Sequence, residues 1–193
     1  MSQGSQFFEG GGKVQETLHR ITKKLDELGI PYAVVGGMAL FAHGFRRYTE
    51  DVVILVTKDG LDKIHSELDG RGYLPPFEKS KHLRDTDTGV KIEFFTTGGF
   101  PGDGKEKPVS FPDPEKVAEI HQGLRCINLP SLVELKLASG ISAAHRLKDI
   151  ADVQEIIRVL KLPQQFGEQL NPYVRDKFDE LWGTMQTDAW DQE

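Results

Sequence analysis

Asp51 stands directly before a run of branched apolar residues, in the stretch RRYTEDVVILV at 46–56. A run with almost no polar alternation is typical of a strand that is buried on both faces. The carboxylate is therefore expected at the mouth of a buried strand, a place suited to metal chemistry. Val53 should share the face of Asp51, because side chains alternate along a strand, and Glu50 should point to the opposite face.

Two glycines and a second carboxylate belong to neighbouring predicted strands. Gly36 and Gly37 follow the apolar run YAVV. Because they lack a Cβ, they allow the backbone to approach a phosphate chain closely. Glu93 lies inside the apolar run VKIEFF, where a carboxylate without a partner would be costly. The alternatives are a strand that merely ends at Asp51 and a tight glycine turn without a ligand.

A small sheet with helices around it is expected to position these residues. The apolar spacing predicts strands at YAVV, at 52–56, at 90–95 and at RCINL, with helices between them. The segment DPEKVAEIH is predicted as one short helix, and the part after residue 128 as helical. The predicted class is therefore α/β, with a core at 13–128, a helical C-terminal part at 129–185, and tails at 1–12 and 186–193.

Composition restricts the function classes. The chain has 193 residues and a net charge of −6, so the overall charge gives no sign of nucleic-acid binding through a broad basic surface. A single cysteine, Cys126, excludes an internal disulfide and fits a reducing compartment. No apolar run approaches the ~20 residues that span a bilayer, so we expect a cytoplasmic protein without a membrane partner.

Two other kinds of site are disfavoured by spacing. The loop GFPGDGKE at 99–106 approaches a phosphate loop, but Glu106 stands where a hydroxyl is needed and the following KPVSFP cannot open a helix. The six histidines are scattered, and none pairs with another His or with Cys at the spacing of a structural zinc site.

The order of motifs resembles the nucleotidyltransferase superfamily. Its pattern is Gly-Gly, a short helix, Asp-x-Asp opening a strand, and a third carboxylate on a neighbouring strand. Here thirteen residues separate Gly37 from Asp51, and the R-x-T-x-D segment supplies Arg47 and Thr49. The branch that looks most similar includes small bacterial proteins related to abortive-infection (toxin-antitoxin) nucleotidyltransferases. Later K-L-x-A and K-D-x-x-D motifs of that branch are matched at 136–139 and 148–152.

The resemblance implies a small mixed sheet and transfer of a nucleoside monophosphate from a nucleoside triphosphate to a hydroxyl acceptor. It implies Mg²⁺ as cofactor, with its preference for oxygen ligands. The implied roles are metal binding by Asp51 and Glu93; phosphate or nucleotide binding by Gly36, Gly37, Arg47, Thr49 and Lys136; and positioning of Lys136 or of an acceptor by Asp149. The acceptor implied is tRNA, a protein or a small molecule.

The sequence departs from this pattern at Val53, where the second Asp is expected. Valine cannot bind a metal ion, so two-metal catalysis is expected to be impaired. The alternative functions are an inactive nucleotide- or protein-binding module and a toxin-antitoxin component acting on tRNA. For Lys136 the alternative is a solvated helix lysine. For Asp149 and Asp152 it is a surface pair with Arg146 or Lys148.

Overall fold

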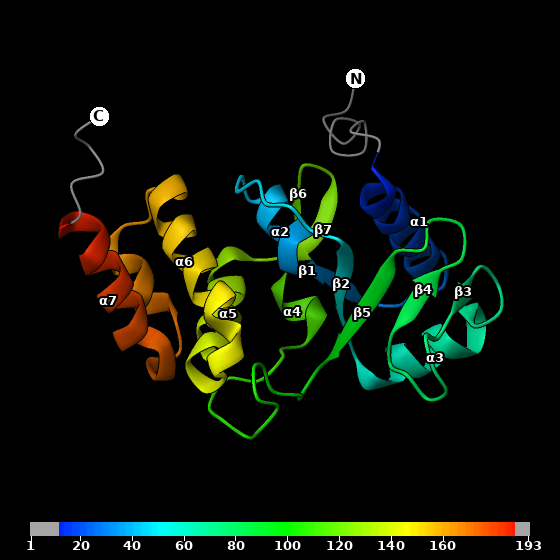
Figure 1. The fold of residues 1–193 in the computed structure, drawn as a ribbon. Coiled ribbons are helices and arrows are strands. Elements are labelled where there is room, and N and C mark those ends of the chain that lie inside the picture. Colours follow the sequence, from blue (N-terminus) through cyan, green and yellow to red (C-terminus); the bar gives the residue numbers. More distant parts are fainter. Residues whose placement is uncertain (1–11, 188–193) are drawn as a thin grey trace. The chain divides into compact units, whose positions relative to one another are not determined.

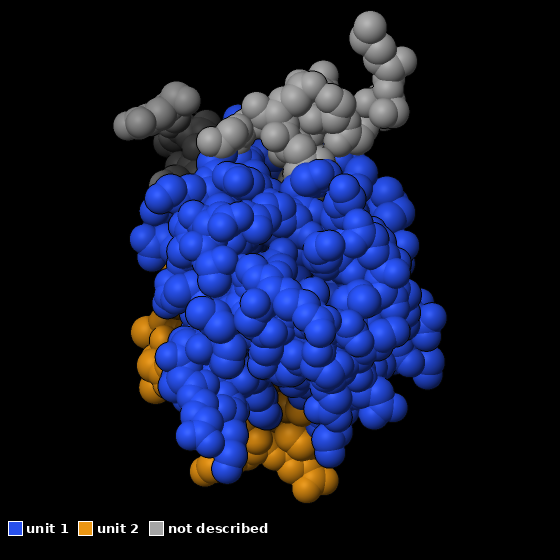
Figure 2. Space-filling view, turned by 90° about the vertical axis from the view of Figure 1, so that its right-hand side faces the viewer, with its two compact units in different colours: residues 1–98, 112–128 blue, residues 99–111, 129–193 orange. Residues whose placement is uncertain are grey.

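The computed structural model describes residues 12–187, and these divide into two compact units. Unit 1 comprises residues up to 98 together with 112–128, and unit 2 comprises 99–111 together with the residues from 129 onward (Figure 2). The loop at 99–111 thus groups with the helical part of the chain. The tails predicted at 1–12 and 186–193 lie outside the described residues, apart from residues 12, 186 and 187.

A seven-stranded mixed sheet forms the centre of unit 1 (Figure 1). Its strands are β1 Tyr32–Val35, β2 Asp51–Val56, β3 Tyr73–Leu74, β4 Leu83–Asp85, β5 Lys91–Thr96, β6 Ala118–His121 and β7 Leu124–Ile127. They lie in the order β3-β4-β5-β2-β1-β7-β6. β2 is parallel to β5 and antiparallel to β1, so the three central strands mix both directions. The predicted α/β class with a small mixed sheet is confirmed.

Unit 1 contains four helices in the described part of the chain. They are α1 Lys13–Glu27, α2 Gly36–Ala42, α3 Lys58–Leu68 and α4 Pro114–Val117. The apolar stripe of α1, carried by Leu18, Ile21 and Leu25, is fully buried, and α1 contacts β2. Gly29 follows α1 with a φ of +64°, a conformation that glycine adopts without strain. The Thr57 hydroxyl accepts a hydrogen bond from the Gly60 N–H and caps α3.

One predicted helix is wrong in its second half. DPEKVAEIH was predicted as a single helix, but α4 ends at Val117 and residues 118–121 form β6. β6 and β7 make a hairpin, and its two turn residues, Gln122 and Gly123, have φ values of 51° and 81°. Two positive φ values in a two-residue loop suit the twist of paired strands. Strand pairing therefore outweighs the local helical pattern here.

Unit 2 is built from three helices that pack against one another. They are α5 Leu129–Ser142, α6 Leu147–Leu160 and α7 Pro172–Thr187, with 3-10 segments at Ala144–Arg146 and Gln164–Gln169. The Trp182 indole N–H donates to the Leu162 carbonyl at 3.0 Å, which ties α7 to the segment after α6. No helix in the described part of the chain is both long and apolar enough to cross a membrane.

Candidate functional site

The glycine pair lies at the junction of β1 and α2, in close contact with β2. Gly36 has a φ of +66°, and a Cβ added to it would lie 3.0 Å from Cγ2 of Val53. A Cβ on Gly37 would lie 2.8 Å from Cβ of Thr49. Both positions therefore require glycine, because side chains from the start of β2 occupy the adjacent space.

Strand register brings the predicted residues into one row. Val35, directly before the glycines, pairs with Val53 across β1 and β2, and Val53 pairs with Glu93 across β2 and β5. Asp51 pairs with Lys91 on the same two strands. Each lies two residues before Val53 or Glu93, so the four side chains share one face of the sheet. Val35, Val53 and Glu93 thus follow one another across three adjacent strands, with Gly36 directly after Val35 and Asp51 two residues before Val53.

Asp51 is half-buried at the first position of β2. The Thr49 hydroxyl lies 3.1 Å from its Oδ1 and 3.2 Å from its carbonyl oxygen, and donates to them. Glu50 is exposed, and its carboxylate accepts a hydrogen bond from the Tyr48 hydroxyl at 3.3 Å. Arg47, also half-buried, lies in the same irregular segment before β2. Asp51 is thus held in orientation by a neighbouring hydroxyl.

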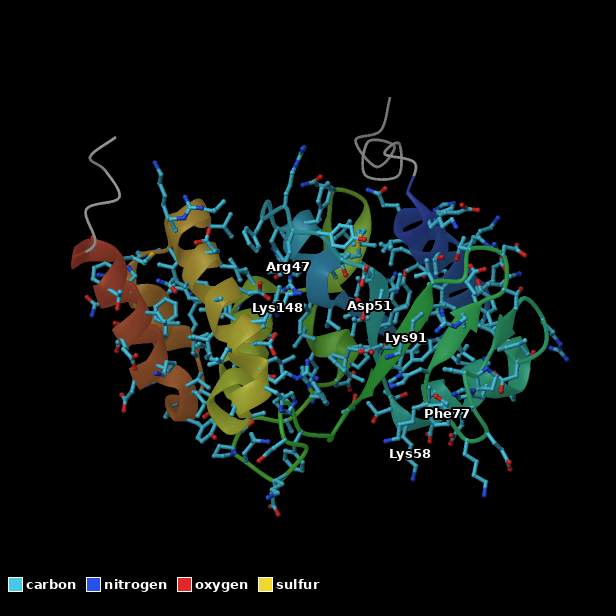
Figure 3. The ribbon with its side chains drawn as sticks, in the orientation of Figure 1. Arg47, Asp51, Lys58, Phe77, Lys91 and Lys148 are labelled. Atoms are coloured by element: carbon cyan, nitrogen blue, oxygen red, sulfur yellow. The ribbon has the colours of Figure 1, made fainter. Side chains whose placement is uncertain are left out.

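Glu93 has a partner that the sequence patterns did not single out. Its carboxylate forms a salt bridge with the Lys91 ammonium, two residues away on the same face of β5. The side chains of Lys91 and Glu93 are 37% and 24% exposed, so the pair is partly open to solvent. Figure 3 labels Asp51 and Lys91 on the neighbouring strands β2 and β5. The signal available in the sequence was the spacing in KIE, which places Lys91 and Glu93 on one face.

The row does not provide the oxygen ligands of a two-metal site. Val53 offers no donor atom and is only 8% exposed, and the Glu93 carboxylate is engaged by Lys91. Within residues 12–187 no group of three or more His, Cys, Asp or Glu side chains could hold a metal ion. The residues do suit one Mg²⁺ that arrives already bound to phosphates, because such an ion commonly needs only one or two carboxylates.

Lys136 and Asp149 belong to a compact ionic cluster inside unit 2. The Lys136 ammonium donates to Oδ1 of Asp149 at 3.0 Å and to Oδ2 of Asp152 at 2.7 Å. The Ser139 hydroxyl donates to Oδ2 of Asp149 at 2.7 Å. The alternative of a solvated Lys136 is wrong, since its side chain is only 9% exposed. Both aspartates form salt bridges with this lysine.

Two opposing effects act on the pKa of Asp149. Burial alone would raise it, because an ionised carboxyl is poorly solvated there. The charge of Lys136 and the hydrogen bonds from Ser139 and Lys136, helped by the charge of Arg146, lower it by more. The pKa of Asp149 is lowered overall, so this carboxyl is ionised at neutral pH and forms an ion pair with Lys136.

A cavity of about 510 Å³ lies elsewhere in unit 1 and contains none of the predicted site residues. Its lining includes Lys58, Lys79, Lys81 and Thr96. Thr96 pairs with Val56, at the other end of the parallel strands from Asp51. In Figure 3 the label of Lys58 stands at the lower edge of unit 1, apart from Asp51.

Comparison with solved structures identifies the fold. The chain is similar to an antigenic nucleotidyltransferase-like protein from Paracoccidioides brasiliensis, with 17% sequence identity and a TM-score of 0.52. The match covers 93% of this chain and 89% of that one. The fold is nucleotidyltransferase-like.

Two further solved structures match this chain at lower similarity. JHP933 from Helicobacter pylori is 16% identical with a TM-score of 0.48, over 89% of this chain and 88% of that chain. The antibiotic-resistance factor ANT(2'')-Ia is 14% identical with a TM-score of 0.46, over 90% of this chain and 91% of that chain. No protein-family model and no curated protein matches the sequence.

Proposed function

We propose that this protein binds a nucleoside triphosphate beside Gly36 and Gly37 and transfers its nucleoside monophosphate to a hydroxyl acceptor. The observation that carries the proposal is the row across β1, β2 and β5, in which Gly36, Asp51 and Glu93 come together within a nucleotidyltransferase-like sheet. This fold and this set of residue types suit a phosphate chain that is held by backbone N–H groups and whose Mg²⁺ faces the carboxylates.

In this proposal the acceptor hydroxyl gives up its proton to solvent and its oxygen attacks the α-phosphorus. The bond from that phosphorus to the bridging oxygen breaks, and pyrophosphate leaves. Mg²⁺ enters as part of the nucleotide substrate, where it balances phosphate charge. Asp51 is the carboxylate best placed to meet it, because its Oδ1 accepts a hydrogen bond from the neutral Thr49 hydroxyl, whereas the Glu93 carboxylate is bound by the Lys91 ammonium. Arg47 is proposed as a phosphate ligand.

Lys136 and Asp149, which belong to the helical unit 2, have roles of their own in this proposal. The predicted phosphate contact of Lys136 stays a prediction, because its ammonium is bound by Asp149 and Asp152. We propose that Asp149 positions Lys136, which agrees with the 3.0 Å distance between their charged atoms.

The test is binding of Mg·ATP, Mg·GTP, Mg·CTP and Mg·UTP by calorimetry, followed by transfer of α-labelled phosphate. Asp51→Asn removes the free carboxylate and should weaken binding by about 10-fold or more, as loss of a charged interaction does. Glu50→Gln is the matched control, because Glu50 is exposed and bonded to Tyr48, and should bind as the unchanged chain does.

Absence of binding for all four nucleotides would contradict the proposal, and so would equal weakening by the two variants. Binding without label transfer would reduce the function to that of a nucleotide-binding module.

A further inference from the structure

Lys91 contacts Glu93, one of the carboxylates that the predicted pattern assigns to metal binding. In that pattern the metal ligands would be carboxylates at positions 51, 53 and 93, of which 53 and 93 pair across β2 and β5. Here position 53 is valine, and the ammonium that contacts the Glu93 carboxylate comes from Lys91. The cation next to this carboxylate is therefore supplied by the chain itself.

We propose that the Lys91 ammonium replaces one of the two metal ions and binds the triphosphate directly, so that the site takes one divalent ion, carried by the nucleotide. The inference rests on the proposed function and adds to it a phosphate ligand and a metal count. An ammonium has three donors, and the salt bridge to Glu93 occupies one of them. The remaining N–H groups of a side chain that is 37% exposed are available to phosphate oxygens.

The charges of the row agree with this replacement. Three carboxylates at 51, 53 and 93 would carry three negative charges, which two divalent ions would balance. With Val53 and Lys91 the row carries Asp51, Glu93 and one ammonium, so that it needs less added positive charge.

An ordinary surface salt bridge is the competing explanation of the Lys91–Glu93 contact. Such pairs contribute little to stability, and they form wherever opposite charges share a strand face. Two observations set this pair apart. Lys91 is in register with Asp51, and Glu93 is in register with the buried Val53 that packs on Gly36. The pair therefore occupies the row that the phosphate chain would follow.

The experiment measures Mg·ATP affinity and counts bound metal with Mn²⁺ and a non-hydrolysable ATP analogue, by electron paramagnetic resonance. The unchanged chain should bind one Mn²⁺ per chain in the presence of the analogue. Lys91→Met should weaken Mg·ATP binding by about 10-fold or more, and Lys91→Arg should retain it. The double variant Val53→Asp with Lys91→Met should bind two Mn²⁺ per chain, because it restores the carboxylate set and removes the ammonium.

Lys58→Met is the matched control, since Lys58 borders the cavity at the other end of the parallel strands. It should leave the affinity unchanged. Two Mn²⁺ ions bound by the unchanged chain would overturn the inference but leave the proposed function intact. Loss of binding in Lys58→Met, with full binding in Lys91→Met, would overturn the inference, because it would show that the nucleotide binds at the cavity. Absence of any nucleotide binding would refute the proposed function itself.

Discussion

Two lysines of this protein bind carboxylates in very different surroundings. Lys136 in unit 2 is buried and contacts two aspartates, while Lys91 in unit 1 is partly exposed and contacts one glutamate. A buried charge that loses its partner is left poorly solvated, which destabilises the folded state. An exposed ammonium can exchange its partner for a ligand at little cost. The difference separates an ion pair that maintains the fold from one that is free to take part in binding.

The largest expected effect is on the buried lysine. Lys136→Met leaves Asp149 and Asp152 close together without their cation, and loss of one partner of a buried pair costs about 3–5 kcal/mol. Urea unfolding followed by circular dichroism measures the change. Lys148→Met is the control, because Lys148 lies on α6 next to Asp149 and is exposed. Similar free energies of unfolding for the Lys136 and Lys148 variants would mean that the buried ion pairs of Lys136 do not stabilise the fold.

The next effect concerns the apolar residue between the carboxylates. Val53→Asp should lower the free energy of unfolding by about 1.5–3 kcal/mol without nucleotide, because a buried valine is lost. Mg²⁺ and nucleotide should restore part of this loss, since ligands that bind only the folded state stabilise it. Thermal melts with and without Mg·ATP test both statements.

Val53→Asn is the control for this change. It has nearly the same shape as Val53→Asp but no charge, so it should lose the same stability, and Mg·ATP should stabilise it no more than it stabilises the unchanged chain. Equal recovery of the two variants would show that the added carboxylate binds no metal.

The third effect tests the close packing beneath the row. Gly37→Ala places a Cβ 2.8 Å from Cβ of Thr49, and overpacking of this kind costs about 1–3 kcal/mol. Gly183→Ala is the contrast, because no atom lies within 4 Å of the added methyl group and alanine favours helix, so that this variant should gain up to ~1 kcal/mol. Denaturant midpoints of the two variants should therefore move in opposite directions.

The central strands and the longer helices could be predicted from sequence because their apolar patterns are long. The runs at 32–35 and 52–56 contain little polar alternation, and the stripe of α1 repeats at helical spacing. β3 and β4 escaped prediction because they are two and three residues long and contain exposed side chains. β6 was missed because its pairing with β7, through the turn at Gln122, is a tertiary feature.

The candidate site could be placed but not completed from sequence. The order of Gly36, Asp51 and Glu93 along the chain was enough to predict that they share a sheet region. Prediction of the Lys91–Glu93 salt bridge would have required the directions of both side chains on β5. Strand alternation gives the face on which a side chain lies but not its direction on that face. The burial of Lys136 depends on packing between α5 and α6, and a helix pattern with a lysine in it is equally compatible with exposure.

The smallest effect is the pH dependence of the buried cluster. The folded-state pKa of Asp149 lies below its ordinary value of 3.8. Its contribution to stability is therefore fully present above pH 3.8 and is lost as the pH falls through the lower folded-state value. Asp149→Asn should remove this part of the acid dependence, so that the free energy of unfolding falls less between pH 4 and pH 2 than in the unchanged chain. Urea unfolding at a series of pH values gives both slopes.

Glu93→Gln is the matching change in the other ion pair. Glu93 is partly exposed, so its removal should leave the acid dependence of stability close to that of the unchanged chain. A flattened slope in Asp149→Asn alone would show that the two lysines differ in linkage to folding as well as in burial. Equal flattening by both variants would mean that the Lys91–Glu93 pair also stabilises the folded state, and that it is less available to a ligand than its exposure indicates.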